Sequence, residues 1–206
     1  MSFAAKSWRV FIWVTSIGVA LVSYRFLALG LDGAFEALAH QLKEYRIGFF
    51  VHVIAAPIAL FIVPFQLSEK FRNKYRVIHR YMGRVYCIAI LFAGVTGLII
   101  AFNAGGGTTG RFGFGILAVL WLGTTYMGYA KARARKFVEH RKWMFRSFAL
   151  TFAGVMLRVI LPLELIGGMS FDQAYMIVAW ACWVPNLLIV EYYLHREARN
   201  KKMAIG

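Results

Sequence analysis

Residues 48–67 read GFFVHVIAAPIALFIVPFQL, a run without a single Asp, Glu, Lys or Arg. An α-helix of about 20 mostly apolar residues is long enough to cross the hydrocarbon core of a bilayer. The run lacks the strict alternation of apolar and polar residues that is typical of a strand in a membrane barrel. It therefore predicts a membrane-spanning helix that carries one histidine, His52.

The composition of the whole chain leads to the same class of protein. Of the 206 residues, 60% are hydrophobic, 17% are aromatic and only 16% are charged. A soluble globule of this size has too much surface for its volume to bury so much apolar side chain. Soluble enzymes, secreted disulfide scaffolds and disordered chains are excluded. The two cysteines, Cys87 and Cys182, lie inside apolar runs and form no CxxC pair, so they are interpreted as buried apolar residues.

Six apolar stretches of membrane-spanning length occur in the sequence. We therefore expect an all-α fold, an integral membrane bundle of six transmembrane helices that forms a single domain over residues 1–206. The predicted spans cover residues 10–29, 48–67, 82–102, 112–130, 144–163 and 174–194.

Two connections between spans have recognisable patterns. Apolar residues recur at helical spacing between the first two spans, which predicts a short interfacial helix there. These residues are Leu31, Phe35, Leu38, Leu42 and Tyr45. Residues 105–110, GGGTTG, lack the Gly-Lys-Ser/Thr of a P-loop and are interpreted as a flexible linker.

The charge distribution predicts the orientation in the membrane. The formal net charge is +15, and 19 of the 24 Lys and Arg residues fall on one side of the predicted bundle, at positions 6–9, 70–84, 131–146 and 196–202. Cytoplasmic loops collect Lys and Arg, so we expect a multi-pass protein of the cell inner membrane with both termini in the cytoplasm. The partners expected are the lipid bilayer and anionic phospholipids at the cytoplasmic loops. Nucleic acid is not needed to explain the charge.

Two polar residues fall in the outer halves of predicted spans, His52 in the second and Arg158 in the fifth. An arginine within a span costs at least about 2.5–3.5 kcal/mol, so it should face the bundle interior and have a partner. One interpretation is that Arg158 extends outward to Glu164. The other is that Arg158 and His52 bind an anionic or carbonyl-bearing ligand, such as a quinone.

A second pair of residues, His79 and His140, stands at the cytoplasmic ends of the third and fifth spans, which run in the same direction. Two imidazoles at one depth are the ligand set of a bis-histidine haem, so both are candidate metal ligands. We expect Arg80, Arg84 and Arg146 to meet the propionates and Tyr86 to line the porphyrin. The alternative is contact with lipid head groups.

These residues belong to two signatures, HRxxGRxY from His79 to Tyr86 and HRxWMxRS from His140 to Ser147. In both, the chain resembles a bacterial family of multi-pass predicted membrane proteins of unknown function, over about residues 48–158. The resemblance implies a multi-helix membrane fold without an established activity. More loosely, the chain is similar to transmembrane cytochrome b proteins that pass electrons from ascorbate across membranes. That likeness implies haem histidines at His52, His79 and His140.

Three functional hypotheses follow. The first is a membrane redox protein, a possible membrane oxidoreductase, with one haem b between His79 and His140 and a quinone-like carrier near His52 and Arg158. The second is a non-redox transporter or binder of a small anionic or amphiphilic solute. The third is an accessory subunit that docks on a membrane protein partner. No catalytic residue is assigned.

Overall fold

The computed structural model describes residues 3–203, without the side chains of residues 3–6, 37, 40, 41, 201 and 202. Lys6, Lys201 and Lys202, which contribute to the predicted inner-face charge, therefore lie outside the described side chains. Within the described residues the regular structure is helical throughout. The elements are α1 (Phe3–Ser23), α2 (Phe26–Ala34), the 3₁₀ turn η1 (Glu36–Leu38), α3 (Ala39–Leu67), α4 (Glu69–Lys74), α5 (Arg76–Ala101), α6 (Gly107–Arg133), α7 (Phe137–Thr151), α8 (Ala153–Ile166), α9 (Phe171–Ala181) and α10 (Val184–Met203).

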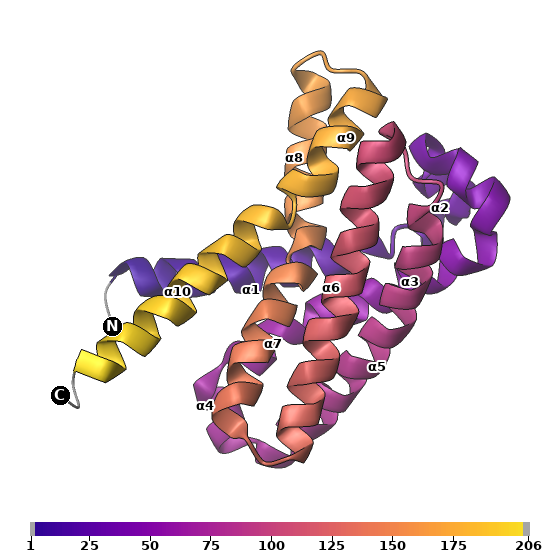
Figure 1. Cartoon of the computed structure of the whole chain (residues 1–206). Helices are drawn as coiled ribbons and strands as arrows, with labels where there is room; N and C mark the ends of the chain where they lie inside the picture. The colour runs from indigo at the N-terminus through magenta and orange to yellow at the C-terminus, as the bar shows by residue number, and fades with distance from the viewer. Residues whose placement is uncertain (1–2, 204–206) are drawn as a thin grey trace.

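Four long helices form the centre of the molecule. Helix α3 packs on α5, α5 on α6 and α6 on α7, and α7 returns to α3, so α5 and α7 face each other across the bundle. Helices α8 and α9 continue beyond α7 at one end, α10 diverges from the bundle, and α1 crosses it to pack on α3 and α8 (Figure 1). The buried core lies between these helices and includes Ile90, Val63 and Val178.

The prediction of several membrane-spanning helices is confirmed, whereas the count of six depends on the first span. Five segments are long and apolar enough to cross a bilayer. They are residues 42–67, 76–101, 107–133, 137–166 and 171–200, and each contains one of the predicted spans 2 to 6, apart from Phe102 at the end of the third. A sixth crossing exists only if the bent pair Ser7–Ser23 and Phe26–Ala34 is one span.

The first predicted span is bent by 74° between these two helices. Two side chains at the bend are tied to other elements. The Tyr24 hydroxyl donates to the carbonyl oxygen of Ile54 in α3 at 2.8 Å, and Arg25 Nη2 donates to the carbonyl oxygen of Ala34 at 2.7 Å. The Tyr24 bond holds the α1–α2 elbow, the residues 23–26 at the bend, against α3, and the Arg25 bond joins the elbow to the far end of α2.

The predicted interfacial helix is not a separate element. Residues 31–45 are divided among the end of α2, the η1 turn and the start of α3, with a break at Tyr45 (φ −127°, ψ 38°). Phe35 and Leu42 are buried in a second core cluster with Phe26 and Phe49. The apolar residues of this region therefore pack against the protein itself.

The glycine-rich linker is also packed more tightly than expected. Gly106 has a φ of 76° as the N-cap of α6, and a Cβ atom there would lie 2.6 Å from the backbone nitrogen of Met176 in α9. The Gly106 N–H donates to Asp172 Oδ1 at 3.3 Å. The segment is thus a close contact between α6 and α9, which only glycine can make without displacing α9.

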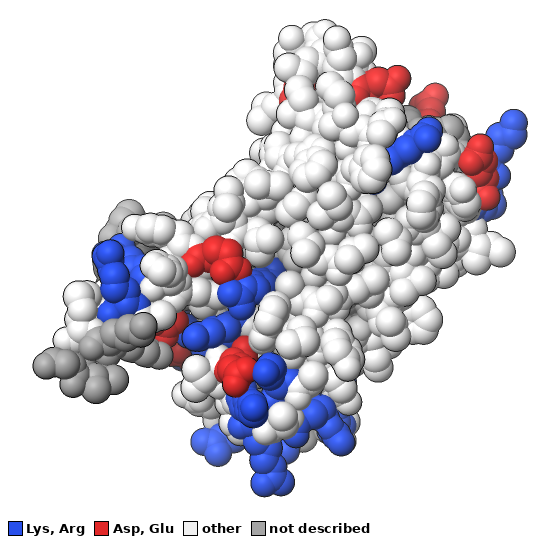
Figure 2. All heavy atoms as spheres, in the orientation of Figure 1, with Lys and Arg blue, Asp and Glu red and all other residues white. Residues whose placement is uncertain are grey.

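The positive charge gathers at one end of the molecule. In the view of Figure 2, Lys and Arg side chains cover the lower end, over α4 and the α6–α7 turn, and the outer part of α10. The surface between this end and the opposite end is almost uncharged in the same view. This is the pattern expected of a protein that crosses a membrane with one basic end.

The contact between α6 and α9 gives a test of the fold. A Cβ atom on Gly113 would lie 2.9 Å from both the Cβ and the carbonyl oxygen of Ala179, whereas a Cβ on Gly115 would meet nothing within 4 Å. We expect Gly113→Ala to lower the free energy of unfolding by about 1–3 kcal/mol through overpacking. Gly115→Ala should leave it unchanged or raise it, because alanine favours helix. Thermal unfolding of both variants in detergent measures the difference, and equal midpoints would contradict this packing.

Candidate functional site

A cavity of about 720 Å³ lies between the α1–α2 elbow, α3, α5, α6, α8 and α9, at the end of the bundle opposite to the basic end. Its volume is in the range of small-molecule binding sites, which are mostly apolar with a few polar groups. Most of its walls are apolar or aromatic, including Phe49, Phe114 and Tyr175. The polar groups on its walls include His52 and Arg158, the two residues that the sequence predicted to meet.

Arg158 is held over the cavity by its own helix. Its Nη1 donates to the carbonyl oxygen of Gly154 at 2.8 Å. The Nε and Nη2 atoms have no hydrogen-bond partner among the described residues, yet they are not among the fully enclosed unpaired atoms, so they face open space. No ion pair joins Arg158 to any described carboxylate, and Glu164 Oε2 is itself buried without a partner. The structure therefore contains no Arg158–Glu164 pair.

His52 lies on the α3 side of the same cavity. Its Nδ1 is 2.8 Å from the carbonyl oxygen of Ala93 in α5, and a carbonyl can only accept, so Nδ1 carries the proton. Gly97 makes room for this edge of the ring, since a Cβ there would lie 3.1 Å from Nδ1 and Cε1. Nε2 has no partner among the described residues and keeps some exposed surface. The charge of Arg158 acts on the His52 ring, so the two side chains are electrostatic neighbours.

The mouth of the cavity lies beside the α1–α2 elbow. The exposed lining residues are Val22, Arg25, Gly33 and Glu36 on this side and Pro162 on α8. The Arg25 guanidinium stacks 4.8 Å from the centre of the Phe35 ring, and its charge acts on Arg158. Glu36 is the only acid among the described lining residues. The cavity thus carries net positive charge, with one arginine at the mouth and one inside.

A cluster of polar side chains forms the floor of the cavity and fills the centre of the bundle. The cluster consists of Tyr86 from α5, Trp121 and Thr125 from α6, and Ser147 and Thr151 from α7. Across the helices, the Tyr86 hydroxyl is 2.8 Å from Ser147 Oγ and 2.7 Å from Thr151 Oγ1, and Trp121 Nε1 donates to Thr151 Oγ1 at 2.8 Å. Thr125 Oγ1 is 2.6 Å from Ser147 Oγ. We call these five residues the hydroxyl cluster.

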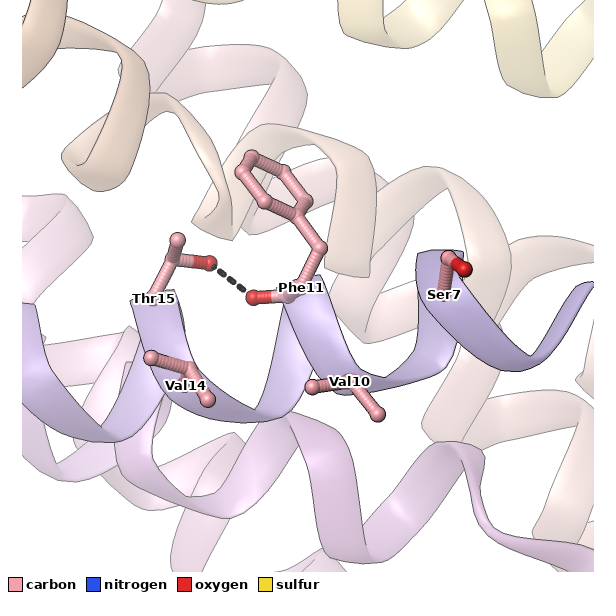
Figure 3. A pocket seen from close by; sticks show the side chains of 5 residues that line it. All are labelled: Ser7, Val10, Phe11, Val14 and Thr15. Carbon is pink, nitrogen blue, oxygen red and sulfur yellow. Dashed lines mark hydrogen bonds between the residues drawn. The ribbon is translucent and has the colours of Figure 1, made fainter. Parts of the chain in front are cut away.

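A second hollow, of about 480 Å³, lies on the outer face of α1 (Figure 3). It is lined by Ser7, Val10, Phe11, Val14 and Thr15, all from this one helix. The Thr15 hydroxyl donates to the carbonyl oxygen of Phe11 at 2.7 Å, so it is already satisfied. A mostly apolar stripe on a single helix is what lipid chains or another helix contact, and it does not gather groups that could hold a small polar ligand.

The predicted haem histidines lie at the basic end, on the far side of the hydroxyl cluster from the cavity. His140 Nδ1 is 2.8 Å from the carbonyl oxygen of Gly128, which leaves Nε2 available for another partner. His79 Nδ1 is buried and has no partner among the described residues. A charge on His140 acts on His79, so the two rings are close enough to interact electrostatically. Their role as haem ligands stays a prediction.

The other residues predicted around the haem are divided between different environments. Arg146 donates to Glu191 Oε2 at 2.8 Å and lies 4.8 Å from the centre of the Trp143 ring. Arg84 stacks on Tyr81, and Arg80 is exposed. Tyr86 is fully buried in the hydroxyl cluster. Arg146 and Tyr86 are thus engaged with partners other than the two histidines.

A comparison with protein families identifies the chain. Residues 49–194 match the family described as predicted membrane protein (DUF2306). The chain belongs to the DUF2306 family. This confirms the predicted membership of a multi-pass membrane family of unknown function, while the likeness to transmembrane cytochromes b stays a prediction. No curated protein and no solved structure matches the chain.

In this DUF2306 protein the matched region contains His52, Arg158, the hydroxyl cluster and both haem candidates, whereas Arg25 and Glu36 at the cavity mouth precede it. Sequence reasoning did not identify Trp121, Thr125 or Arg25 as parts of a site. Nothing in the sequence of residues 107–133 distinguishes Trp121 and Thr125 from ordinary residues of a span.

The hydroxyl cluster can be tested by removing one oxygen from the DUF2306 protein. Tyr86→Phe deletes the hydroxyl that contacts Ser147 and Thr151, and interhelical hydrogen bonds in membrane proteins contribute about 0.6–2 kcal/mol. We expect this loss in the free energy of unfolding, measured by denaturant titration in detergent. Tyr126→Phe is the matched control, because Tyr126 is exposed on α6. An equal effect of both substitutions would show that the cluster does not stabilise the bundle.

Proposed function

We propose that this protein binds a small amphiphilic molecule whose anionic or carbonyl-bearing head group is held by Arg158 inside the cavity. The observation that carries the proposal is a guanidinium inside an apolar bundle without a described carboxylate partner. A buried cation without a counter-ion is unfavourable, so a residue of this kind within a span is a functional-site hypothesis by default.

The walls of the cavity support an amphiphilic ligand rather than a small inorganic anion. Aromatic and aliphatic side chains from α3, α5, α6, α8 and α9, with Val22 of α1 and Leu150 of α7, surround the space, and they would contact an apolar body. The mouth beside the α1–α2 elbow is flanked by Val22 and Pro162, which are apolar and exposed. A molecule dissolved in the bilayer could approach between these residues, with Arg25 attracting its head group.

The orientation proposed from sequence places this cavity in the outer half of the membrane of the cell. The basic end, with α4 and the α6–α7 turn, would face the cytoplasm together with both termini. The hydroxyl cluster separates the cavity from that end. The protein would therefore take up its ligand from the outer side, as a binder or as the first step of transport.

Binding can be measured through the tryptophan in the cavity wall. Bromine quenches indole fluorescence on contact, so bromododecanoate added to the purified protein should quench Trp121. Arg158→Gln should raise the dissociation constant by about tenfold or more, because a hydrogen bond to a charged group contributes about 1.5–3 kcal/mol. Arg111→Gln, at an exposed arginine at the start of α6, should leave binding unchanged.

Two further probes make this test specific. A bromododecyl trimethylammonium should bind much more weakly than bromododecanoate, because both arginines would repel it. Quenching by the carboxylate should also decrease in Trp121→Phe, which removes the indole at the cavity floor. Equal binding of cation and anion, or equal binding to Arg158→Gln and the unchanged protein, would refute the proposal.

A second candidate function, haem binding, is favoured by the two histidines at the basic end. The tethered ring of His140 presents Nε2, and the buried Nδ1 of His79 is the kind of unsatisfied group that a ligand would complete. The donor set therefore fits a bis-histidine haem b, and a bound haem would supply one-electron chemistry. His79 and His140 would hold it, and Arg80 is exposed and near enough in sequence to meet a propionate.

This candidate is tested by spectroscopy. Protein expressed with excess haem and purified should show a Soret band whose intensity falls in both His79→Ala and His140→Ala, with His195→Ala as the matched surface control. Absence of a Soret band from the unchanged protein would eliminate haem as a cofactor and leave the ligand-binding proposal untouched.

A further inference from the structure

The cavity offers a hydrogen-bond acceptor beside the donors of Arg158, and this narrows the kind of head group that fits. Because the His52 Nδ1–H is committed to the Ala93 carbonyl, the free nitrogen of the neutral ring is Nε2, which can only accept. Arg158 has five N–H groups and no acceptor. A ligand that satisfies both side chains must therefore offer a hydrogen-bond acceptor to Arg158 and a hydrogen-bond donor to Nε2 of His52.

A plain carboxylate satisfies only one of them. Its oxygens accept from Arg158, but they carry no hydrogen for Nε2 of His52, and two acceptors facing each other repel. We propose that the natural head group combines an acidic or carbonyl oxygen with a hydroxyl on a neighbouring atom, as in a hydroxy acid or a monoprotonated phosphate ester. This inference rests on the proposed function and names the head group of the ligand that occupies that cavity.

The surroundings of His52 support a fixed rather than an adaptable acceptor. The Nδ1–Cε1 edge of the ring rests against α5 at Ala93 and Gly97, so the ring cannot turn to present Nδ1 to the cavity without losing a buried hydrogen bond. Arg158 lines the same cavity as this ring. The hydroxyl cluster does not supply a substitute acceptor, because Thr151 Oγ1 already contacts both Tyr86 and Trp121.

The experiment compares ligands of equal chain length on the purified full-length protein. Dodecanoate, 2-hydroxydodecanoate, 3-hydroxydodecanoate and dodecyl phosphate compete with bromododecanoate for quenching of Trp121 near pH 7. At least one hydroxy acid should bind about three- to tenfold more tightly than dodecanoate, the factor expected for one neutral hydrogen bond. Testing both positional isomers covers the two shortest separations between hydroxyl and carboxylate.

Three variants test whether the preference for a hydroxy acid over dodecanoate depends on Nε2 of His52. In His52→Asn the amide nitrogen can still donate to Ala93, but the acceptor at Nε2 is lost, so the advantage of the hydroxy acid should disappear. In His52→Gln a terminal oxygen can replace Nε2, and part of the advantage should remain. Arg158→Gln should weaken all four ligands while the ratio between them persists.

The outcomes separate this inference from the proposed function. If all acids bind equally to the unchanged protein, or if His52→Asn keeps the preference, the head-group inference is wrong and the proposed function survives. If none of the four ligands binds, or if Arg158→Gln has no effect on any of them, both are wrong. Unfolding midpoints of the variants, measured alongside, show whether any loss of binding comes from loss of the fold.

Discussion

The hydroxyl cluster is the contact on which the arrangement of the central helices depends. Lipid supplies no hydrophobic drive between helices, so packing of small residues and hydrogen bonds must hold them in register. Tyr86, Trp121 and Thr151 come from three different helices and meet within 2.7–2.8 Å. Because α5 and α7 face each other across the bundle, the Tyr86 side chain joins them through the centre. A shift of either helix along its axis would separate these atoms.

The same cluster divides the interior into two unlike ends. On the basic side, arginines on α7 are matched by carboxylates on α10, as Arg141 is with Glu197 and Arg146 with Glu191. On the cavity side, Arg158 has no such partner among the described residues. The chain has only nine acidic residues for 24 basic ones, and the ion pairs found in the structure use the acids near the membrane surfaces. Arg158, by contrast, lines an interior cavity and forms no ion pair with a described carboxylate.

Much of the fold could be predicted from sequence because lipid imposes a simple rule. Each span must satisfy its own backbone, so it is a helix whose length and apolar character can be recognised directly. Five of the six predicted spans lie, to within one residue at their ends, inside the segments that are long and apolar enough to cross a bilayer, although two of them run through two helices each. The elbow at Tyr24 and Arg25 could not be predicted, since it depends on a partner 30 residues away in sequence, the carbonyl oxygen of Ile54. The tight contact of Gly106 with Met176 has the same origin, because a glycine run looks flexible until another helix packs on it.

Site residues could be predicted from sequence where their side chains are unfavourable inside a membrane span. They could not be predicted where the residue type is common in spans. An arginine or histidine inside a span is unfavourable enough to indicate a role by its presence alone, and His52 and Arg158 are indeed in one cavity. Trp121 and Thr125 are ordinary in a span, and only the geometry places Trp121 in the cavity wall and Thr125 against Ser147. The tautomer of His52 is even harder to predict from sequence, because it is set by a backbone carbonyl on another helix. The hydrogen bonding available in a cavity thus depends partly on backbone groups that have no signature in sequence, and here the carbonyl oxygen of Ala93 fixes which nitrogen of the neutral His52 ring carries the hydrogen.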